Sequence, residues 1–285
     1  MAETSVHIDP PASDLKPEPE TDLDRFAAFC RFYAEIHALD GAYAEGMAAH
    51  RAAADRLFEQ SLGFLDRLPW SRIATALDVG MGYGRHCAAF AKRGLKTTGL
   101  TVHLPPELRA HAREHAYEVV EGDMHEVPAD DGAYDLVWSS HSLEHSFSPL
   151  LALREWLRVC KPGGWLAVTV PPHKSQVVSG HFTTGWSVGQ LAYMLAVAGC
   201  DCREWLFVRE GYNVRALVRR PATDARSEGA SWMFNAIERL PSVIRASAVV
   251  LPNSLGKLAF EGEIDRIEPE EGPLASTRHR PARDA

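Results

Sequence analysis

The sequence of 285 residues has no long apolar run, and it is poor in cysteine. No stretch approaches the roughly 20 apolar residues that a membrane-spanning helix requires, and the first residues contain no apolar signal-peptide core. The five cysteines are odd in number and lack the spacing of a disulfide framework, which is typical of a reducing compartment. We therefore expect a cytoplasmic protein without a membrane span.

A surplus of basic residues is also missing. The chain has 30 Lys and Arg against 38 Asp and Glu, for a net charge of −8. Sequence-independent binding of a phosphate backbone needs the opposite balance, so we expect no nucleic-acid partner. Gly and Pro, with 21 and 18 residues, are near average usage, which excludes collagen-like and linker-like chains. With 46% hydrophobic residues, the composition is that of a globular protein.

The chain is predicted to divide into five segments. Its first residues are rich in proline and acidic side chains, and they cannot bury enough apolar surface to fold. Apolar residues at helical spacing precede and follow a region of alternating strands and helices. The predicted segments are a disordered tail (1–20), an N-terminal helical segment (21–70), a core domain (71–222), a C-terminal helical segment (223–266) and a second disordered tail (267–285).

In the core domain, short apolar runs alternate with helical stretches, which is typical of βαβ units around a parallel sheet. Strands are expected at 73–79, 95–102, 117–122, 134–139 and 165–170. Helices are expected at 85–93, 106–115, 149–160 and 187–198.

Three local patterns complete the predicted core. Extended runs at 204–209 and 212–219, separated by Glu210 and Gly211, predict an antiparallel hairpin. The sequence Lys161-Pro-Gly-Gly164 predicts a turn between the preceding helix and the next strand. The basic run at 215–220 is interpreted as the solvated face of an edge strand.

Three alternate glycines follow the first predicted strand, in Asp78-Val-Gly80-Met-Gly82-Tyr-Gly84-Arg85. Glycine allows a tight turn and close approach of a ligand, and the helix that follows offers unpaired N–H groups. A dinucleotide fingerprint needs G-x-G-x-x-G and an acid at the end of the second strand. Both are missing, which disfavours a nicotinamide-dependent oxidoreductase. Taken alone, the glycines could form only a tight strand-to-helix turn.

Further motifs follow in order along the chain: Glu121-Gly-Asp-Met124, Tyr134-Asp-Leu-Val137, Leu143-Glu-His145 and Lys161-Pro-Gly-Gly164. The ordered set, over residues 73–220, resembles the class I S-adenosylmethionine-dependent methyltransferases, in the small-molecule (type 11-like) group. The resemblance implies an α/β fold with a Rossmann-like, doubly wound, seven-stranded sheet, a terminal antiparallel hairpin and flanking N- and C-terminal helices. It also implies S-adenosyl-L-methionine as cofactor, and a methyltransferase of the EC 2.1.1 class acting on a small molecule.

The resemblance assigns roles to matched positions. The glycine loop would border the methionine and ribose portions of the cofactor, and Asp78 would fix the loop and the amino-acid end. Asp123 would accept a hydrogen bond from the adenine amino group, with Met124 packing on the ring; alternatively, Asp123 only forms an Asx-turn that closes the third strand. The implied cofactor-binding residues are Asp78, Gly80, Met81, Gly82, Gly84, Thr101, Asp123, Met124 and Ser140.

Thr101 departs from the family pattern. Most relatives end the second strand with an acid that holds both ribose hydroxyls, whereas threonine is uncharged and should hold the ribose less firmly. Either a backbone amide or Glu107 compensates, or cofactor affinity is reduced. The missing acid also motivates a second hypothesis, a catalytically silent methyltransferase-like binding or scaffold protein.

Histidines are the candidate catalytic residues. Methyl transfer is accelerated by holding the reactants in line in a dry site, and a hydroxyl acceptor also benefits from a general base near neutral pH. His141 and His145 follow the fourth strand, at the sheet edge where open α/β sheets bind ligands. His173 and His181 are further candidates. The alternative for each is a solvated or hydrogen-bonded loop histidine.

No metal site is predicted. Cys200-Asp-Cys202 lacks a second ligand pair, and the motifs above account for Asp123, Asp135 and Glu144. The stretches 180–186 and 199–202 are loosely similar to methyltransferases of bacterial surface-polysaccharide pathways. That similarity implies an oxygen of a sugar or glycan precursor as the acceptor, and it leaves the oligomeric state open.

Overall fold

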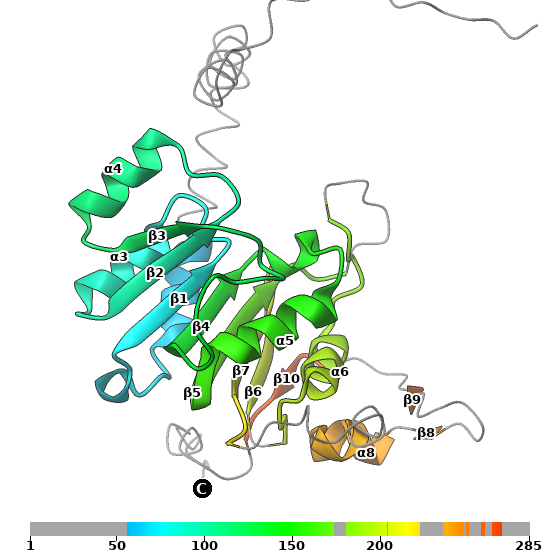
Figure 1. Ribbon diagram of the computed structural model, residues 1–285. Coiled ribbons are helices and arrows are strands. Elements are labelled where there is room, and N and C mark those ends of the chain that lie inside the picture. The colour runs from blue at the N-terminus through cyan, green and yellow to red at the C-terminus, as the bar shows by residue number, and fades with distance from the viewer. Residues whose placement is uncertain are drawn as a thin grey trace, which may run out of the picture. The chain divides into compact units, whose positions relative to one another are not determined.

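The computed structural model describes residues 56–173, 181–203, 205–222, 236–247, 249–250, 258–259 and 264–269 (Figure 1). The predicted first tail, the predicted N-terminal helical segment up to residue 55, and residues 270–285 of the second tail lie outside this part. The chain divides into two units, 1–61 and 62–285. The strands and helices named below all belong to the second unit.

A single eight-stranded sheet organises this unit, in the order β10-β6-β7-β5-β4-β1-β2-β3. Its strands are β1 (Thr75–Val79), β2 (Lys96–Thr101), β3 (Glu118–Glu121), β4 (Tyr134–Ser140), β5 (Cys160–Val170), β6 (Leu206–Glu210), β7 (Asn213–Arg219) and β10 (Arg266–Ile267). Strands β1 to β5 pair in parallel, whereas β7, β6 and β10 add antiparallel. The predicted α/β class and terminal hairpin are confirmed, and β10 adds one strand to the seven predicted.

The helices also follow the predicted order. They are α3 (Arg85–Lys92), α4 (Pro106–Glu114), α5 (Pro149–Val159), α6 (Val188–Ala198) and α8 (Ser242–Ser247), with short 3-10 helices η1 (Trp70–Arg72), η2 (Leu143–His145) and η4 (Ile237–Arg239). Proline opens α4 and α5, where its missing N–H costs nothing. Helix α6 is capped by Ser187, whose Oγ accepts from the Gln190 N–H at 3.1 Å. Within the described residues, no helix is long and apolar enough to cross a membrane.

Two apolar clusters pack the helices against the sheet. The larger one joins the sheet to α5, which crosses β4 and β5 in Figure 1, and it contains the fully buried Trp138 and Trp156. The smaller one consists of Met81, Cys87, Leu108, Ala112 and Tyr117. Because Met81 belongs to the glycine loop, this second cluster anchors the loop to α3 and α4.

The predicted turn at Lys161–Gly164 is wrong. Helix α5 ends at Val159 and β5 begins at Cys160, so these residues lie within the strand. They form a bulge, because the pairing steps from Tyr134↔Cys160 to Leu136↔Trp165. The Gly163 N–H donates to the Arg220 carbonyl oxygen at 2.9 Å, and the Arg220 N–H donates to that of Gly164 at 2.9 Å. The end of β7 thus supplies backbone partners that the local sequence does not reveal.

The interpretation of residues 215–220 as a solvated edge is also wrong. Strand β7 lies between β5 and β6, so it is an interior strand. Arg215 is fully buried and forms an ion pair with Glu210. Its guanidinium is tolerated in the interior because this carboxylate compensates its charge.

Two further strands, β8 (Val249–Val250) and β9 (Leu258–Ala259), form a small separate sheet. They fall in the predicted C-terminal helical segment, as do η4 and α8. The domain boundaries as a whole stay a prediction.

Candidate active site

In the glycine loop between β1 and α3, described protein atoms leave the backbone uncovered at the central residue, Gly82. Gly80, Gly82 and Gly84 have φ values of +70°, +52° and +75°, which side-chain-bearing residues rarely adopt. A Cβ on Gly80 would lie 2.1 Å from Ser142 Oγ, whereas a Cβ on Gly82 would meet no atom within 4 Å. Gly80 is therefore required by packing, and the space beside Gly82 is free for a ligand.

Asp78 lies beneath this loop and is only 2% exposed. Burial raises the pKa of its carboxyl group to about 7, although a hydrogen bond from Cys87 Sγ to Asp78 Oδ2, at 3.4 Å, partly opposes the shift. The carboxylate form is consequently destabilised until a further hydrogen-bond donor or cation approaches.

Asp123 follows β3 and is fixed by its neighbour His125. Its Oδ1 accepts from the His125 backbone N–H at 2.8 Å and lies 2.5 Å from His125 Nδ1. These hydrogen bonds lower the pKa of the Asp123 carboxyl group. The bond to the backbone two residues on is the Asx-turn weighed above. The role of His125 was missed, although the two-residue spacing was visible in the sequence.

His125 also contacts a serine, so that Asp123, His125 and Ser146 follow one another as in a hydrolase triad. His125 Nε2 lies 2.7 Å from Ser146 Oγ. Ser146 is fully buried, however, and its Oγ also accepts from the Ser148 N–H at 3.1 Å. A catalytic nucleophile must be able to reach its substrate, and the buried Ser146 cannot. We therefore interpret the three residues as an arrangement that orients Asp123, whose side chain is 58% exposed.

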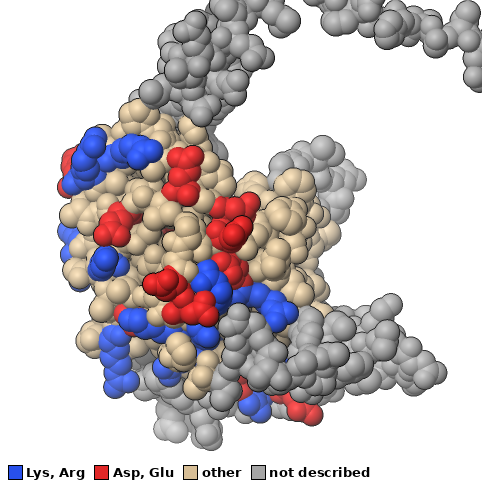
Figure 2. All heavy atoms as spheres, viewed as in Figure 1, with Lys and Arg blue, Asp and Glu red and all other residues tan. Residues whose placement is uncertain are grey.

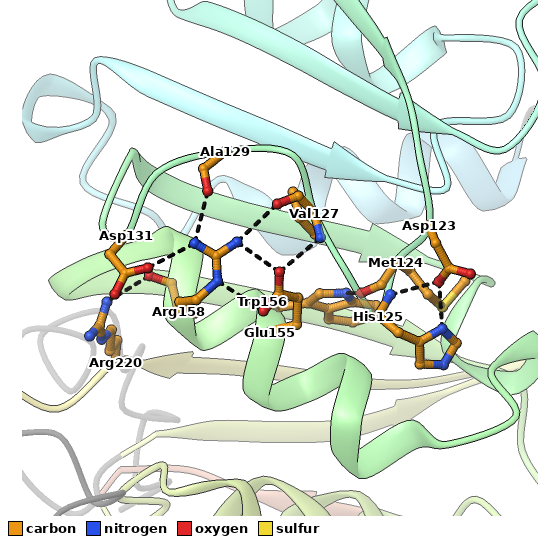
Figure 3. A network of polar contacts seen from close by, with 10 residues as sticks. All are labelled: Asp123, Met124, His125, Val127, Ala129, Asp131, Glu155, Trp156, Arg158 and Arg220. Carbon is orange, nitrogen blue, oxygen red and sulfur yellow. Dashed lines mark hydrogen bonds and ion pairs between the residues drawn. The ribbon is translucent and has the colours of Figure 1, made fainter.

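A polar network ties the loop between β3 and β4 to α5 (Figure 3). At its centre lies Arg158, whose side chain is 22% exposed. Its guanidinium donates, at 2.7–2.9 Å, to the carbonyl oxygens of Val127 and Ala129 and to the carboxylates of Asp131 and Glu155. Since this loop begins with Asp123, Arg158 stabilises the segment that presents the aspartate.

Replacing Arg158 with alanine is expected to lower the free energy of unfolding by about 2–4 kcal/mol, because two backbone carbonyls and two carboxylates lose their donor. Urea unfolding followed by circular dichroism measures the change. The exposed Arg109 of α4 provides a control, and Arg109→Ala should change stability by no more than about 0.5 kcal/mol. Equal effects of the two substitutions would contradict a stabilising role for the network.

His141 follows β4 with a φ of +54°, uncommon for a side-chain-bearing residue. Its Nε2 lies 2.8 Å from the side-chain amide of Asn213. That amide is best oriented with its nitrogen donating to His141 and its oxygen accepting from Arg215 at 3.0 Å. His141 Nδ1 lies 3.4 Å from Glu144 Oε1. Both ring nitrogens therefore face protein groups.

The η2 turn carries Glu144 and His145, and the fold brings the distant His181 close to them. Glu144 is 1% exposed, and among the described residues its carboxylate has no polar partner besides the ion-pair contact with His141. The exposed His145 and the half-buried His181 have ring centroids 4.9 Å apart, at an interplanar angle of 80°. One potential ligand atom from each of these three residues lies within 4.8 Å of the others. His173 is not part of this group, and its Nδ1 lies 3.2 Å from the Thr184 carbonyl oxygen.

The remaining predicted cofactor residues are engaged within the protein. Thr101 Oγ1 donates to the His103 carbonyl oxygen at 2.9 Å and accepts from the His103 N–H at 3.3 Å. Met81 is 4% exposed, and Met124 is half buried against the larger cluster. The Ser140 carbonyl oxygen accepts from Ser142 Oγ at 3.3 Å. The side chain of Glu107, the suggested compensating acid, lies outside the described part.

The cysteine pair lies in the interior of the protein. Cys200 and Cys202 are fully buried in the larger cluster, and burial raises the pKa of both thiols. Cys202 Sγ donates to the Ala192 carbonyl oxygen at 3.6 Å. Thiols that stay protonated are poor metal ligands.

Exposed apolar side chains line the edge of the sheet where the parallel strands end. They follow β1, β2 and β4 or precede β7: Tyr83 (88% exposed), Val102 (75%), Phe147 (68%) and Tyr212 (37%). Figure 2 shows basic and acidic side chains interspersed over the described part of the face it displays. Open α/β sheets bind ligands at this edge.

Residues 77–168, from β1 into β5, match the family model described as a methyltransferase domain. Over this span the chain resembles the class I S-adenosylmethionine-dependent methyltransferases. The cofactor of this class is S-adenosylmethionine. The open backbone at Gly82, beside the amino end of α3, fits such a ligand, because nothing in the described protein fills that space.

Two curated relatives of the methyltransferase domain are each 33% identical to this chain. Malonyl-acyl-carrier protein O-methyltransferase of Salmonella typhimurium matches over 105 residues, 37% of this chain and 42% of that protein. Glycine/sarcosine/dimethylglycine N-methyltransferase of Actinopolyspora halophila matches over 126 residues, 42% of this chain and 22% of that protein. Both matches span less than two thirds of the relative's length.

The fold is shared with a chain of the solved complex of the Haloferax volcanii Trm112 methyltransferase activator and a methyltransferase. The TM-score is 0.51 and the identity 21%, over 61% of this chain and 94% of that one. The likeness confirms the Rossmann-like architecture of the methyltransferase domain.

Proposed function

We propose that the protein transfers a methyl group from S-adenosylmethionine to a small-molecule acceptor. One observation carries the proposal: the glycine loop contacts the turn that bears the histidines. Ser142 Oγ donates to the Gly80 carbonyl oxygen at 3.3 Å, immediately before η2 (Leu143–His145). A ligand beside Gly82 and an acceptor beside η2 would therefore be neighbours at one sheet edge.

The cofactor is assigned to the glycine loop. When bound, S-adenosylmethionine supplies an electrophilic methyl group on its sulfonium. We assign Gly80, Gly82 and Gly84, with the N–H groups at the start of α3, to its methionine and ribose portions. Asp78 supports the loop from below, and Asp123, oriented by His125, accepts from the adenine amino group. Because the Thr101 hydroxyl is engaged with His103, the ribose depends on backbone groups.

The acceptor is assigned to η2 and its surroundings. The chain accelerates transfer chiefly by holding the acceptor in line and excluding water. We assign contact with the acceptor to the exposed His145. His141, with both ring nitrogens facing protein groups, is proposed as a positioning residue that orients η2. Met124, next to Asp123, is assigned to pack on the adenine ring, and Ser140 is assigned to the cofactor side of the site.

More specifically, we assign the methylated atom to an oxygen of a sugar or glycan precursor. Besides the loose sequence similarity of 180–186, the described residues of this stretch support it. Phe182 is 74% exposed and follows His181 in the sequence, and Phe147, two residues after His145, is 68% exposed and stacks on His125 with one face of its ring. Flat aromatic rings suit the apolar faces of sugars, and imidazoles suit their hydroxyls.

An acceptor panel tests the proposal. The full chain is incubated with S-adenosylmethionine and with nucleotide sugars, free sugars, acyl carriers or amines, and S-adenosylhomocysteine is quantified. We expect it to form with a sugar acceptor at least tenfold above the no-acceptor control. Formation only with an amine would refute the sugar assignment and keep the methyltransferase. The absence of product with every acceptor would favour the silent scaffold, the hypothesis that Thr101 motivates.

A further inference from the structure

The carboxylate of Glu144 poses an electrostatic problem. It is 1% exposed, and among the described residues its oxygens have one ion-pair partner, His141, whose Nδ1 lies 3.4 Å from Oε1. A single imidazole compensates a buried carboxylate only when the imidazole is protonated, and buried carboxylates are normally fully paired or coordinate a metal.

Two imidazoles lie where a cation would complete the site. His145 is the next residue after Glu144, and His181 comes from the segment after β5. That segment is tied to η2 by the Thr183 N–H, which donates to the Glu144 carbonyl oxygen at 3.1 Å. One ligand atom of each of the three residues lies within 4.8 Å of the others. Atoms bound tetrahedrally at about 2.1 Å lie roughly 3.4 Å apart, so small side-chain rotations close the site.

The donor set indicates the class of ion. Two imidazole nitrogens and one carboxylate oxygen form a set typical of zinc enzymes, and neighbouring transition metals also bind it. Magnesium and calcium prefer oxygen ligands throughout. We propose that Glu144, His145 and His181 bind a divalent transition-metal ion, with zinc as the first candidate.

The surroundings hold the buried ligand in place. His141 lies against the Glu144 carboxylate and is fixed through Asn213 to the buried Arg215. A metal-binding carboxylate is commonly oriented by such outer hydrogen bonds. His141 therefore acts as a positioning residue and lies outside the ligand set.

Three protein ligands leave a coordination position open, as in catalytic zinc sites. This step rests on the proposed function: the open coordination position would bind an oxygen of the acceptor. His145 is then a ligand rather than a free base. No local ligand spacing in the sequence indicates this site, because His181 is distant from the Leu143-Glu-His145 motif along the chain.

Zinc titration of the untagged full chain tests the site. Calorimetry with Zn²⁺ alone should show one ion per chain, and Co²⁺ should give visible absorption bands of low coordination number. His181→Ala and Glu144→Gln should each weaken zinc binding at least 30-fold. His173→Ala, which removes an exposed imidazole outside the cluster, should change it less than twofold. If Glu144→Gln fails to fold by circular dichroism, His181→Ala decides alone.

The outcomes separate this inference from the proposed function. No zinc binding by the parent chain, or equal binding by His181→Ala and His173→Ala, would overturn the metal site. S-adenosylhomocysteine binding, measured on the same samples, should persist in the His181→Ala protein. If the parent chain binds zinc but not S-adenosylhomocysteine, the proposed function fails and the metal site stands.

Discussion

Replacing Gly82 with valine should lower the affinity for S-adenosylhomocysteine at least 100-fold while the protein stays folded. A Cβ at this position would meet no atom of the described residues within 4 Å, so the side chain would intrude into the space assigned to the cofactor. Because residue 82 has a φ of +52°, a valine there should also lower the free energy of unfolding by about 1–2 kcal/mol. A 100-fold loss corresponds to about 2.7 kcal/mol of binding free energy. Calorimetry measures binding, and thermal unfolding confirms the fold.

Gly94 offers a matched control. It has a φ of +86°, a Cβ there would also meet no atom within 4 Å, and it lies just before β2, at the opposite sheet edge. Gly94→Val should therefore cost similar stability and leave affinity unchanged. Equal losses of affinity in the two variants would mean that backbone strain, rather than occupied cofactor space, explains the Gly82 result. Gly80→Val should also impair folding, because its Cβ would lie 2.1 Å from Ser142 Oγ.

Replacing Asp78 with asparagine is expected to stabilise the ligand-free protein above pH 7. Burial raises the pKa of this carboxyl group from 3.8 to about 7, so the folded state binds its proton more tightly than the unfolded state does. This contribution to stability is complete below about pH 4 and is lost as the pH rises towards 7. At about 1.4 kcal/mol per unit, the loss is at most about 4 kcal/mol. The same substitution should weaken S-adenosylhomocysteine binding at least tenfold, because the supporting carboxylate is gone.

Urea unfolding between pH 4 and 9 measures this effect. The difference in stability between the Asp78→Asn protein and the parent should grow in favour of the variant from pH 4 to 7 and then level off. Asp130→Asn, which neutralises an exposed carboxylate, controls for the change in net charge. A difference that does not vary with pH, or that matches the Asp130 control, would show that Asp78 is not the buried titrating group.

The parts of the fold that could be predicted are those that local sequence determines. The glycine loop needs positive φ values at alternate residues, and only glycine adopts them readily, so the pattern was visible. Strands β1 and β4 are buried on both faces, which gives the continuous apolar runs typical of parallel strands. The Asx-turn at Asp123 was likewise recognisable, because it involves a residue only two positions away.

The parts that could not be predicted depend on segments distant along the chain. The bulge at Gly163 is stabilised by Arg220, and β10 is a strand of two residues that pairs with β6. The local sequence indicates that Arg215 is a surface residue, because it does not show that Glu210 of β6 lies beside Arg215 in the folded chain. Similarly, Glu144 was attributed to a motif, and its proximity to His181 follows only from the folded chain. In each case a tertiary contact, rather than a local preference, sets the environment of the side chain.

Titration of the full chain with S-adenosylhomocysteine in a calorimeter shows whether the glycine loop forms a cofactor site. We expect saturable heat for one site per folded chain, with a dissociation constant below 100 µM, which corresponds to a binding free energy of about −5.5 kcal/mol or better. No heat at millimolar ligand, from protein shown by circular dichroism to be folded, would contradict this expectation.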